Sequence, residues 1–167
     1  SLHHRNIIGL VGGCWSVENA SVCLVMELCA AGALQGFVED DTTPFPWATM
    51  RVPVARDVAR AMTYLHSLTP LVLHRDLKPA NVLLAHDPKT QRAGGKLCDF
   101  GESRAAAGAN DKTMTYRGTP LYAAPEVLRR EEADHLCDVW SYGCMLVCLS
   151  TRKLNPYDPT PPVVALE

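Results

Sequence analysis

Three short polar strings in this sequence contain side chains that could do chemistry together. They are residues 74–84 (HRDLKPANVLL), 99–101 (DFG) and 124–126 (APE). A carboxylate such as Asp76 can accept or orient the proton of a hydroxyl group within hydrogen-bond reach. The amide oxygen of Asn81 and the carboxylate of Asp99 are hard ligands that suit Mg²⁺. Taken singly, Asp76 and Asn81 could be plain turn residues, so the pattern gains its meaning from the combination.

In order and spacing, these strings resemble the catalytic loop, the metal-binding triplet and the end of the activation segment of eukaryotic protein kinases. Residues 138–143 (DVWSYG) also resemble the start of the buried helix that supports the catalytic loop in that family. The resemblance implies ATP and Mg²⁺ as cofactors, with Asp76 as catalytic base, Asn81 and Asp99 as metal ligands, and Asp99 close to the nucleotide. Phosphoryl transfer needs positioning and charge neutralisation more than covalent catalysis, which fits these residue types.

Two further residues favour protein substrates with serine or threonine over those with tyrosine. Lys78 lies where serine/threonine kinases carry a lysine that contacts the transferred phosphate. Thr119 resembles the threonine that bonds the catalytic aspartate and lysine in those enzymes. Each could instead be a solvated or capping residue. Residues 64–67 (YLHS) and 138–143 look most like the tyrosine-kinase-like branch, whose members phosphorylate serine and threonine.

The resemblance also implies a regulatory contact in the activation segment. Arg75 would pair there with a phosphorylated residue, because a guanidinium forms charge-assisted hydrogen bonds with phosphate. The candidate acceptors are Thr113, Thr115 and Tyr116. The alternative is that these three simply belong to a polar loop.

Residues 24–30 (LVMELCA) resemble the strand and hinge that join the two kinase lobes. The backbone groups of Glu27 and Cys29 would meet adenine, Met26 would control access to the back of the pocket, and Leu83 would pack under the ring. A methionine in an apolar strand is otherwise a core residue. This assignment therefore depends on the register of the strings further along the chain.

The resemblance also implies structural roles for four more residues. His74 and Phe100 resemble members of the hydrophobic stack of the active state, although both could be ordinary core residues. Glu126 resembles the glutamate that pairs with an arginine near the end of the large lobe, and Asp138 begins the buried helix.

The elements that must position these side chains can be predicted from the apolar patterning. Residues 22–28 form an apolar, β-branched run that predicts a buried strand, and a weaker strand within residues 6–14 ends at Gly12-Gly13. Residues 30–34 form a link and residues 40–46 a loop. Apolar positions at spacings of three and four predict an amphipathic helix over residues 53–66, with Pro53 in its first turn.

Further along, short apolar segments predict strands over residues 71–74, 81–85 and 96–98, with a solvated loop over 87–95. Residues 139–149 are nearly all apolar and predict a helix buried on every side. Cys144 and Cys148 would share one face of it, as packed thiols rather than metal ligands. Residues 155–162 contain prolines and should be irregular.

The expected fold class is therefore α+β, a protein-kinase-like fragment with the end of the small lobe, the hinge and most of a mainly helical large lobe. Residues 1–28 would be the end of the small lobe and the hinge strand, and residues 29–167 the large lobe to just past the central helix. The glycine-rich loop, the strand lysine and its glutamate partner would precede Ser1. We expect the isolated chain to be poorly soluble and inactive, because missing helices would leave apolar faces exposed.

Composition narrows the remaining classes. A net charge of −2 and a pI near 6.3 argue against nucleic-acid binding, and no run is long and apolar enough to span a membrane. Seven cysteines without zinc-type spacing favour reduced thiols in the cytoplasm, or in the cytoplasmic part of a membrane-anchored protein. Two alternatives stay open: a pseudokinase that acts as a scaffold or dimer partner, and a small-molecule phosphotransferase of related fold.

Overall fold

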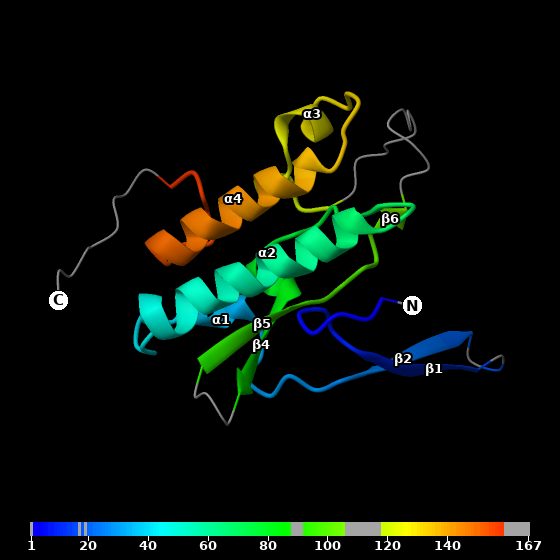
Figure 1. Cartoon of the computed structure of the whole chain (residues 1–167), viewed down its shortest axis with the longest axis horizontal. Helices are drawn as coiled ribbons and strands as arrows, with labels where there is room; N and C mark the ends of the chain where they lie inside the picture. The colour runs from blue at the N-terminus through cyan, green and yellow to red at the C-terminus, as the bar shows by residue number, and fades with distance from the viewer. Residues whose placement is uncertain (1, 17, 19, 88–91, 106–117, 159–167) are drawn as a thin grey trace.

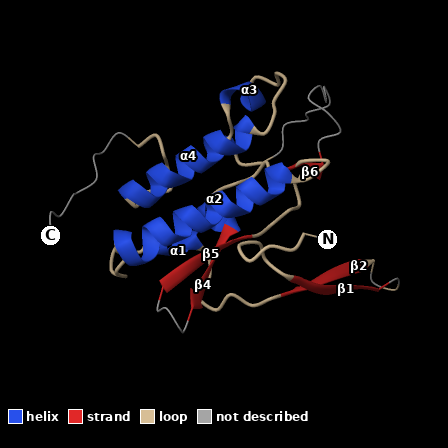
Figure 2. Ribbon diagram, in the orientation of Figure 1, coloured by secondary structure: helices blue, strands red, loops and turns tan. Residues whose placement is uncertain are grey.

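The computed structural model of the chain describes residues 2–16, 18, 20–87, 92–105 and 118–158, and Figure 1 shows how their elements are arranged. Helices and strands are mixed along the chain, as Figure 2 shows. The α-helices are α1 (Leu34–Glu39), α2 (Val52–Ser67), α3 (Pro125–Leu128) and α4 (Leu136–Thr151). The strands are β1 (Leu10–Ser16), β2 (Ser21–Met26), β3 (Val72–Leu73), β4 (Val82–Asp87), β5 (Arg92–Leu97) and β6 (Arg104–Ala105).

The core lies around α2, which has α4 along one side and the β4–β5 hairpin along the other (Figure 1). Its apolar face is fully buried at Val54, Val58, Ala61 and Leu65. This spacing of three and four residues confirms the amphipathic helix predicted over 53–66. A π-helical turn at Trp47–Arg51 runs directly into α2, and Pro53 stands in the first turn of α2.

Helix α4 covers the predicted residues 139–149, but the prediction that it is buried on every side is wrong. Cys144, Met145 and Cys148 face the core, which confirms that the two cysteines share a face. Val139 and Trp140 are 52% and 43% exposed. The helix packs against α2 and the 3-10 turn at Pro120–Tyr122, and the other described elements leave Val139 and Trp140 uncovered.

The predicted strand over 22–28 exists as β2, but it is exposed rather than buried. Among the described strands it pairs only with β1, in antiparallel register, and Val22 and Leu24 are 75% and 62% exposed. A two-stranded ribbon buries neither face unless a further layer packs on it. The prediction that the first strand ends at Gly12-Gly13 is also wrong, because the ladder continues to Ser16.

Strands β3, β4 and β5 confirm the short strands predicted over 71–74, 81–85 and 96–98. The predicted loop over 87–95 is partly wrong, because the antiparallel ladder of β4 and β5 extends to the pair Asp87 and Arg92. Residues 88–91 lie outside the described residues. Strand β3 pairs with β6, and residues 6–8 run along Leu97 of β5 through backbone hydrogen bonds.

Helix α1 was not predicted, because the expected link at 30–34 includes its first residue, Leu34, and residues 35–39 were assigned to no element. It buries Leu34 and Val38 completely. None of the described helices is long and apolar enough to cross a membrane.

Candidate active site

The loop that follows β3 is held in place by the first turn of α4. The buried Asp138 side chain accepts hydrogen bonds from the backbone N–H groups of His74 (2.9 Å) and Arg75 (2.8 Å). Arg75 has a φ of 70°, a left-handed conformation that a side chain rarely adopts unless the surroundings impose it. Asp138 therefore fixes the direction in which the chain enters residue 76.

Asp76 stands at the centre of a network of hydrogen bonds. Its Oδ2 accepts from Lys78 Nζ (2.7 Å) and Asn81 Nδ2 (3.0 Å). Its Oδ1 accepts from the backbone N–H (2.9 Å) and the Oγ1 hydroxyl (2.8 Å) of Thr119. Lys78 Nζ also donates to Thr119 Oγ1 at 2.7 Å. All four residues predicted to be catalytic thus lie together, although Thr119 comes from a distant part of the chain.

The network keeps Asp76 ionised. Burial alone would raise the pKa of this carboxyl, but the hydrogen bonds from Lys78 and Thr119 outweigh burial and hold the pKa below its ordinary value. A carboxylate in this state can accept a hydrogen bond from an incoming hydroxyl. The cation of Lys78 lies beside it, where a negatively charged group would be attracted.

Asn81 and Asp99, the predicted metal ligands, are brought next to each other by the backbone. The Cys98 N–H donates to the Asn81 carbonyl at 2.9 Å, so Asp99 follows directly. Asn81 Nδ2 donates to the Asp76 carbonyl oxygen at 2.8 Å, which fixes the amide and leaves its Oδ1 as an acceptor. The Asp99 side chain is exposed and accepts only the Gly101 N–H among the hydrogen bonds described for it (3.2 Å). A carboxylate and an amide oxygen on adjacent segments fit Mg²⁺.

Gly118 determines how closely Thr119 approaches Asp76. Its φ is 109°, and a Cβ atom at this position would lie 2.6 Å from the Arg75 carbonyl oxygen. A side chain is therefore excluded here both by conformation and by space. Glycine lets the segment before α3 lie against the catalytic loop.

The residues predicted to lie around the adenine ring come from the end of β2, from the segment just after it, and from β4. Met26 is 49% exposed, and Cys29 and Leu83 are partly buried. The Ala33–Leu83 bridge joins the segment after the hinge to β4. Burial raises the pKa of the Cys98 thiol, and Cys29 lies close enough to contribute to that rise. The structure therefore gathers Cys29 and Leu83 near the segment that carries Asp99.

Two of the four predicted structural residues contact each other directly. The rings of His74 and Phe100 meet edge to face with centroids 5.2 Å apart. Burial lowers the pKa of His74, whose Nε2 lies 3.0 Å from the Cys98 carbonyl oxygen. Glu126 stands partly buried in the first turn of α3.

The predicted phosphorylation sites Thr113, Thr115 and Tyr116 lie outside the described residues. The backbone N–H of Arg75 is accounted for by Asp138, as given above.

Sequence reasoning missed two charged or titratable residues that support the site. His66 Nε2, in the last turn of α2, lies 2.9 Å from Asp138 Oδ2. Lys96 Nζ donates to Glu27 Oε1 at 2.7 Å, and the same oxygen accepts the Gly9 N–H at 2.7 Å. The sequence feature that could have indicated the Lys96–Glu27 pair is a lysine inside a short apolar strand.

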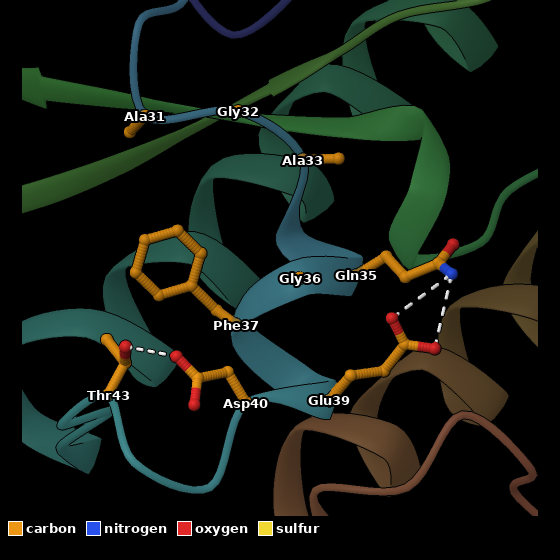
Figure 3. Close-up of a pocket in the computed structure, with 9 residues that line it drawn as sticks. All are labelled: Ala31, Gly32, Ala33, Gln35, Gly36, Phe37, Glu39, Asp40 and Thr43. Carbon is orange, nitrogen blue, oxygen red and sulfur yellow. Dashed lines mark hydrogen bonds between the residues drawn. The ribbon is translucent and has the colours of Figure 1, made fainter.

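A separate cavity of about 530 Å³ lies beside α1, lined by residues between Ala31 and Thr43. Figure 3 shows Phe37, Glu39 and Asp40 around it. The Thr43 hydroxyl donates a hydrogen bond to Asp40, and the Gln35 amide donates one to Glu39. None of the residues around Asp76 or Asp99 lines it. The cavity is thus distinct from the catalytic network.

Comparison with known proteins agrees with this geometry. Residues 1–160 match the family described as "Protein kinase domain". The chain is 39% identical over 156 residues to "Probable serine/threonine-protein kinase drkD" of Dictyostelium discoideum, which covers 93% of this chain and 11% of that protein. It is 37% identical over 160 residues to "Probable serine/threonine-protein kinase SIS8" of Arabidopsis thaliana, which covers 93% of this chain and 15% of that protein.

A third relative, "Probable serine/threonine-protein kinase drkA" of Dictyostelium discoideum, is 34% identical over 162 residues, or 97% of this chain and 24% of that protein. The chain therefore spans a minor part of the length of each of these relatives. It belongs to the protein kinase domain family, with an α+β fold, and these relatives carry the names of serine/threonine kinases.

Proposed function

We propose that the protein containing this chain is a serine/threonine kinase that transfers the γ-phosphate of ATP to protein hydroxyl groups in signal transduction. The observation that carries the proposal is the network joining Asp76, Lys78, Asn81 and Thr119. A carboxylate, a cation and an amide in fixed positions are what phosphoryl transfer requires from a protein.

In this proposal Asp76 accepts a hydrogen bond from the substrate hydroxyl and directs its oxygen toward the phosphorus atom. The ionised state of Asp76 supports this role, because a protonated carboxyl could not accept the proton. Lys78 attracts the phosphate oxygens, and Thr119 holds Asp76 and Lys78 in register. The bond to the leaving ADP breaks as the bond to the hydroxyl oxygen forms.

Asn81 and Asp99 would hold Mg²⁺, which when bound neutralises negative charge on the phosphate oxygens. The backbone of Glu27 and Cys29 would meet the adenine ring, with Leu83 beneath it. Asp99 remains exposed and Asn81 is fixed through its amide nitrogen, so both oxygens are available to a metal.

The partners of this protein would be proteins that present serine or threonine, with a second kinase as a candidate dimer partner. Arg75 would bind a phosphorylated Thr113, Thr115 or Tyr116 of the activation segment. A cytoplasmic location, or the cytoplasmic part of a membrane-anchored protein, would supply ATP and reduced thiols.

The test is an assay of the full-length protein for Mg²⁺-dependent transfer of labelled phosphate to a mixture of Ser-, Thr- and Tyr-containing peptides. We expect transfer to Ser and Thr, and its loss in Asp76→Asn. The matched control is Asp41→Asn, which makes the same change at a side chain that is 85% exposed. This control should retain full activity.

A folded full-length protein that transfers no phosphate would overturn the proposal and favour a scaffold. Transfer to tyrosine alone would overturn the assignment of Lys78 and Thr119. Thermal unfolding of each variant distinguishes loss of chemistry from loss of fold.

A further inference from the structure

The β1–β2 ribbon carries two cysteines that the catalytic site does not use. Cys14 on β1 and Cys23 on β2 are directly opposite each other in the antiparallel register. Both are free thiols and both are exposed. Residues that oppose each other in an antiparallel pair project their side chains on the same face of the sheet.

The backbone spacing of such a pair suits a disulfide. Opposed Cα atoms in antiparallel strands lie about 4.5 or 5.5 Å apart, depending on the hydrogen-bonding pattern. Disulfide-linked cysteines have Cα atoms about 4.4 to 6.8 Å apart. The register irregularity in this ribbon lies between Leu10 and Gly12, so it does not displace the two cysteines.

The neighbours of the two thiols leave them accessible. Alternation along the strands places Gly12 and Ser16 on the same face as Cys14, and Ser21 and Val25 on the same face as Cys23. Three of these four are small residues, and Val25 is 52% exposed. The large Trp15 side chain, which is opposite Val22, belongs to the other face.

Two cysteines of α4 differ in this respect, because they are buried. Burial raises the pKa of Cys137 to about 12 and of Cys148 to about 11. A buried thiol that stays protonated is a poor nucleophile. An oxidant should therefore react with Cys14 and Cys23 before it reacts with the buried cysteines.

We propose that Cys14 and Cys23 form a reversible oxidative-modification site, in which a hydroperoxide converts the two thiols into an intrachain disulfide. One thiolate attacks the peroxide oxygen and becomes a sulfenic acid, with the leaving oxygen released as water. The second thiol attacks the sulfenic sulfur, forms the S–S bond and releases a second water molecule. Two thiols and one hydrogen peroxide thus give one disulfide and two waters. A dithiol reductant restores the thiols by exchange.

The experiment treats the reduced full-length protein with hydrogen peroxide, blocks remaining thiols with an alkylating agent, and cleaves after Glu18 with a glutamate-specific protease. Glu18 lies between the two cysteines, so cleavage separates them unless a disulfide joins the fragments. We expect a linked pair of peptides that has lost two hydrogen atoms and separates on reduction.

Three variants sharpen the test. Cys14→Ser and Cys23→Ser should each abolish the linked pair. The double change Cys14→Ser with Trp15→Cys moves one thiol by a single residue to the opposite face, and it should form the link at least about tenfold more slowly. Circular dichroism shows whether each variant keeps its fold.

Several results would overturn the proposal. One is that both cysteines remain alkylatable while Cys98 or Cys137 is oxidised. Others are separate sulfinic acids at Cys14 and Cys23, disulfides between two molecules, or equally fast linkage in the shifted variant.

Discussion

At the scale of single residues, the site depends on donors that surround one carboxylate. Asp76 is largely buried, with 10% of its side chain exposed, and burial would by itself favour the neutral form. Lys78 and Thr119 reverse that preference. They come from two segments that the sequence separates widely, so the protonation state of Asp76 reports whether the activation segment is correctly seated.

The first prediction concerns Lys78→Met. Losing the ammonium donor at 2.7 Å should raise the pKa of Asp76, which ¹³C NMR titration of its carboxyl carbon would measure. The pKa of Asp76 is lower in the folded protein than the unfolded value of about 3.9, so its ionisation stabilises the fold at pH values above about 3.9. That stabilisation is lost as the pH falls through the folded pKa. The variant should therefore lose less stability on acidification than the wild type. The control is Lys153→Met, in which the pKa of Asp76 should not change. An unchanged pKa of Asp76 in Lys78→Met would contradict this account.

The second prediction concerns Gly118→Ala. The new Cβ would meet the Arg75 carbonyl oxygen at 2.6 Å, so the segment must shift and carry Thr119 away from Asp76. We expect kcat to fall on the order of 100-fold, as small misplacements of catalytic groups do. Gly36→Ala is the matched control, because a Cβ there meets nothing within 4 Å. Equal activity of the two variants would show that Thr119 does not need this close approach.

At the scale of elements, α1 and the loop after it are held by a residue far along the chain. Arg152 donates to the carbonyl oxygens of Phe37 (3.0 Å) and Thr43 (3.1 Å), and also to that of Asp40. Its guanidinium lies over the Phe45 ring. Arg152 itself ends α4 in a left-handed conformation with φ of 55°, where glycine is the usual residue. The side-chain contacts must compensate for that strain.

The third prediction compares two changes at this position. Arg152→Met should destabilise the protein by roughly 2 kcal/mol, because carbonyl groups lose their donor. Arg152→Gly should cost about 1 kcal/mol less, because glycine accepts the left-handed conformation without strain. Urea denaturation measures both, and Lys153→Met, which removes a partly exposed ion pair with Asp158, should change stability by less than about 1 kcal/mol. The opposite order of the two Arg152 variants would mean that the left-handed conformation at this position carries little strain.

These contacts explain which elements the sequence could predict. Helix α2 has a periodic apolar face that buries Val58 and Leu65, so local patterning was sufficient. Helix α1 has six residues, includes Gly36, and depends on Arg152, so no local pattern marks it. The candidate catalytic residues could be proposed from the sequence because their order along the chain is distinctive. The exposure of Val22 and Val139 could not be predicted, because burial depends on which other elements are present to cover a face.

At the scale of the whole molecule, the β1–β2 ribbon joins the helical part through few links. Residues 6–8 pair with β5, and Asn6 Nδ2 donates to the Gly95 carbonyl at 3.1 Å. A further link is Glu27, whose carboxylate accepts hydrogen bonds from both Lys96 Nζ and the Gly9 N–H. The hydrogen bond from Lys96 is the main reason that the pKa of Glu27 is lowered. One charged pair thus connects the strand that leads into the hinge with the strand that leads to Asp99.

The fourth prediction tests that connection with Lys96→Met. Without its cation, Glu27 should leave the position in which it accepts the Gly9 N–H, and the ribbon should open more often relative to β5. We expect the amide hydrogen of Gly9 to exchange about fivefold faster, the effect of losing roughly 1 kcal/mol of local stability. Hydrogen exchange measured by NMR checks this, with Lys153→Met as a control that removes a cation elsewhere. If Gly9 exchanges at the wild-type rate in Lys96→Met, the backbone pairing of residues 6–8 with β5 is sufficient to hold the ribbon, and Glu27 contributes no restraint of its own.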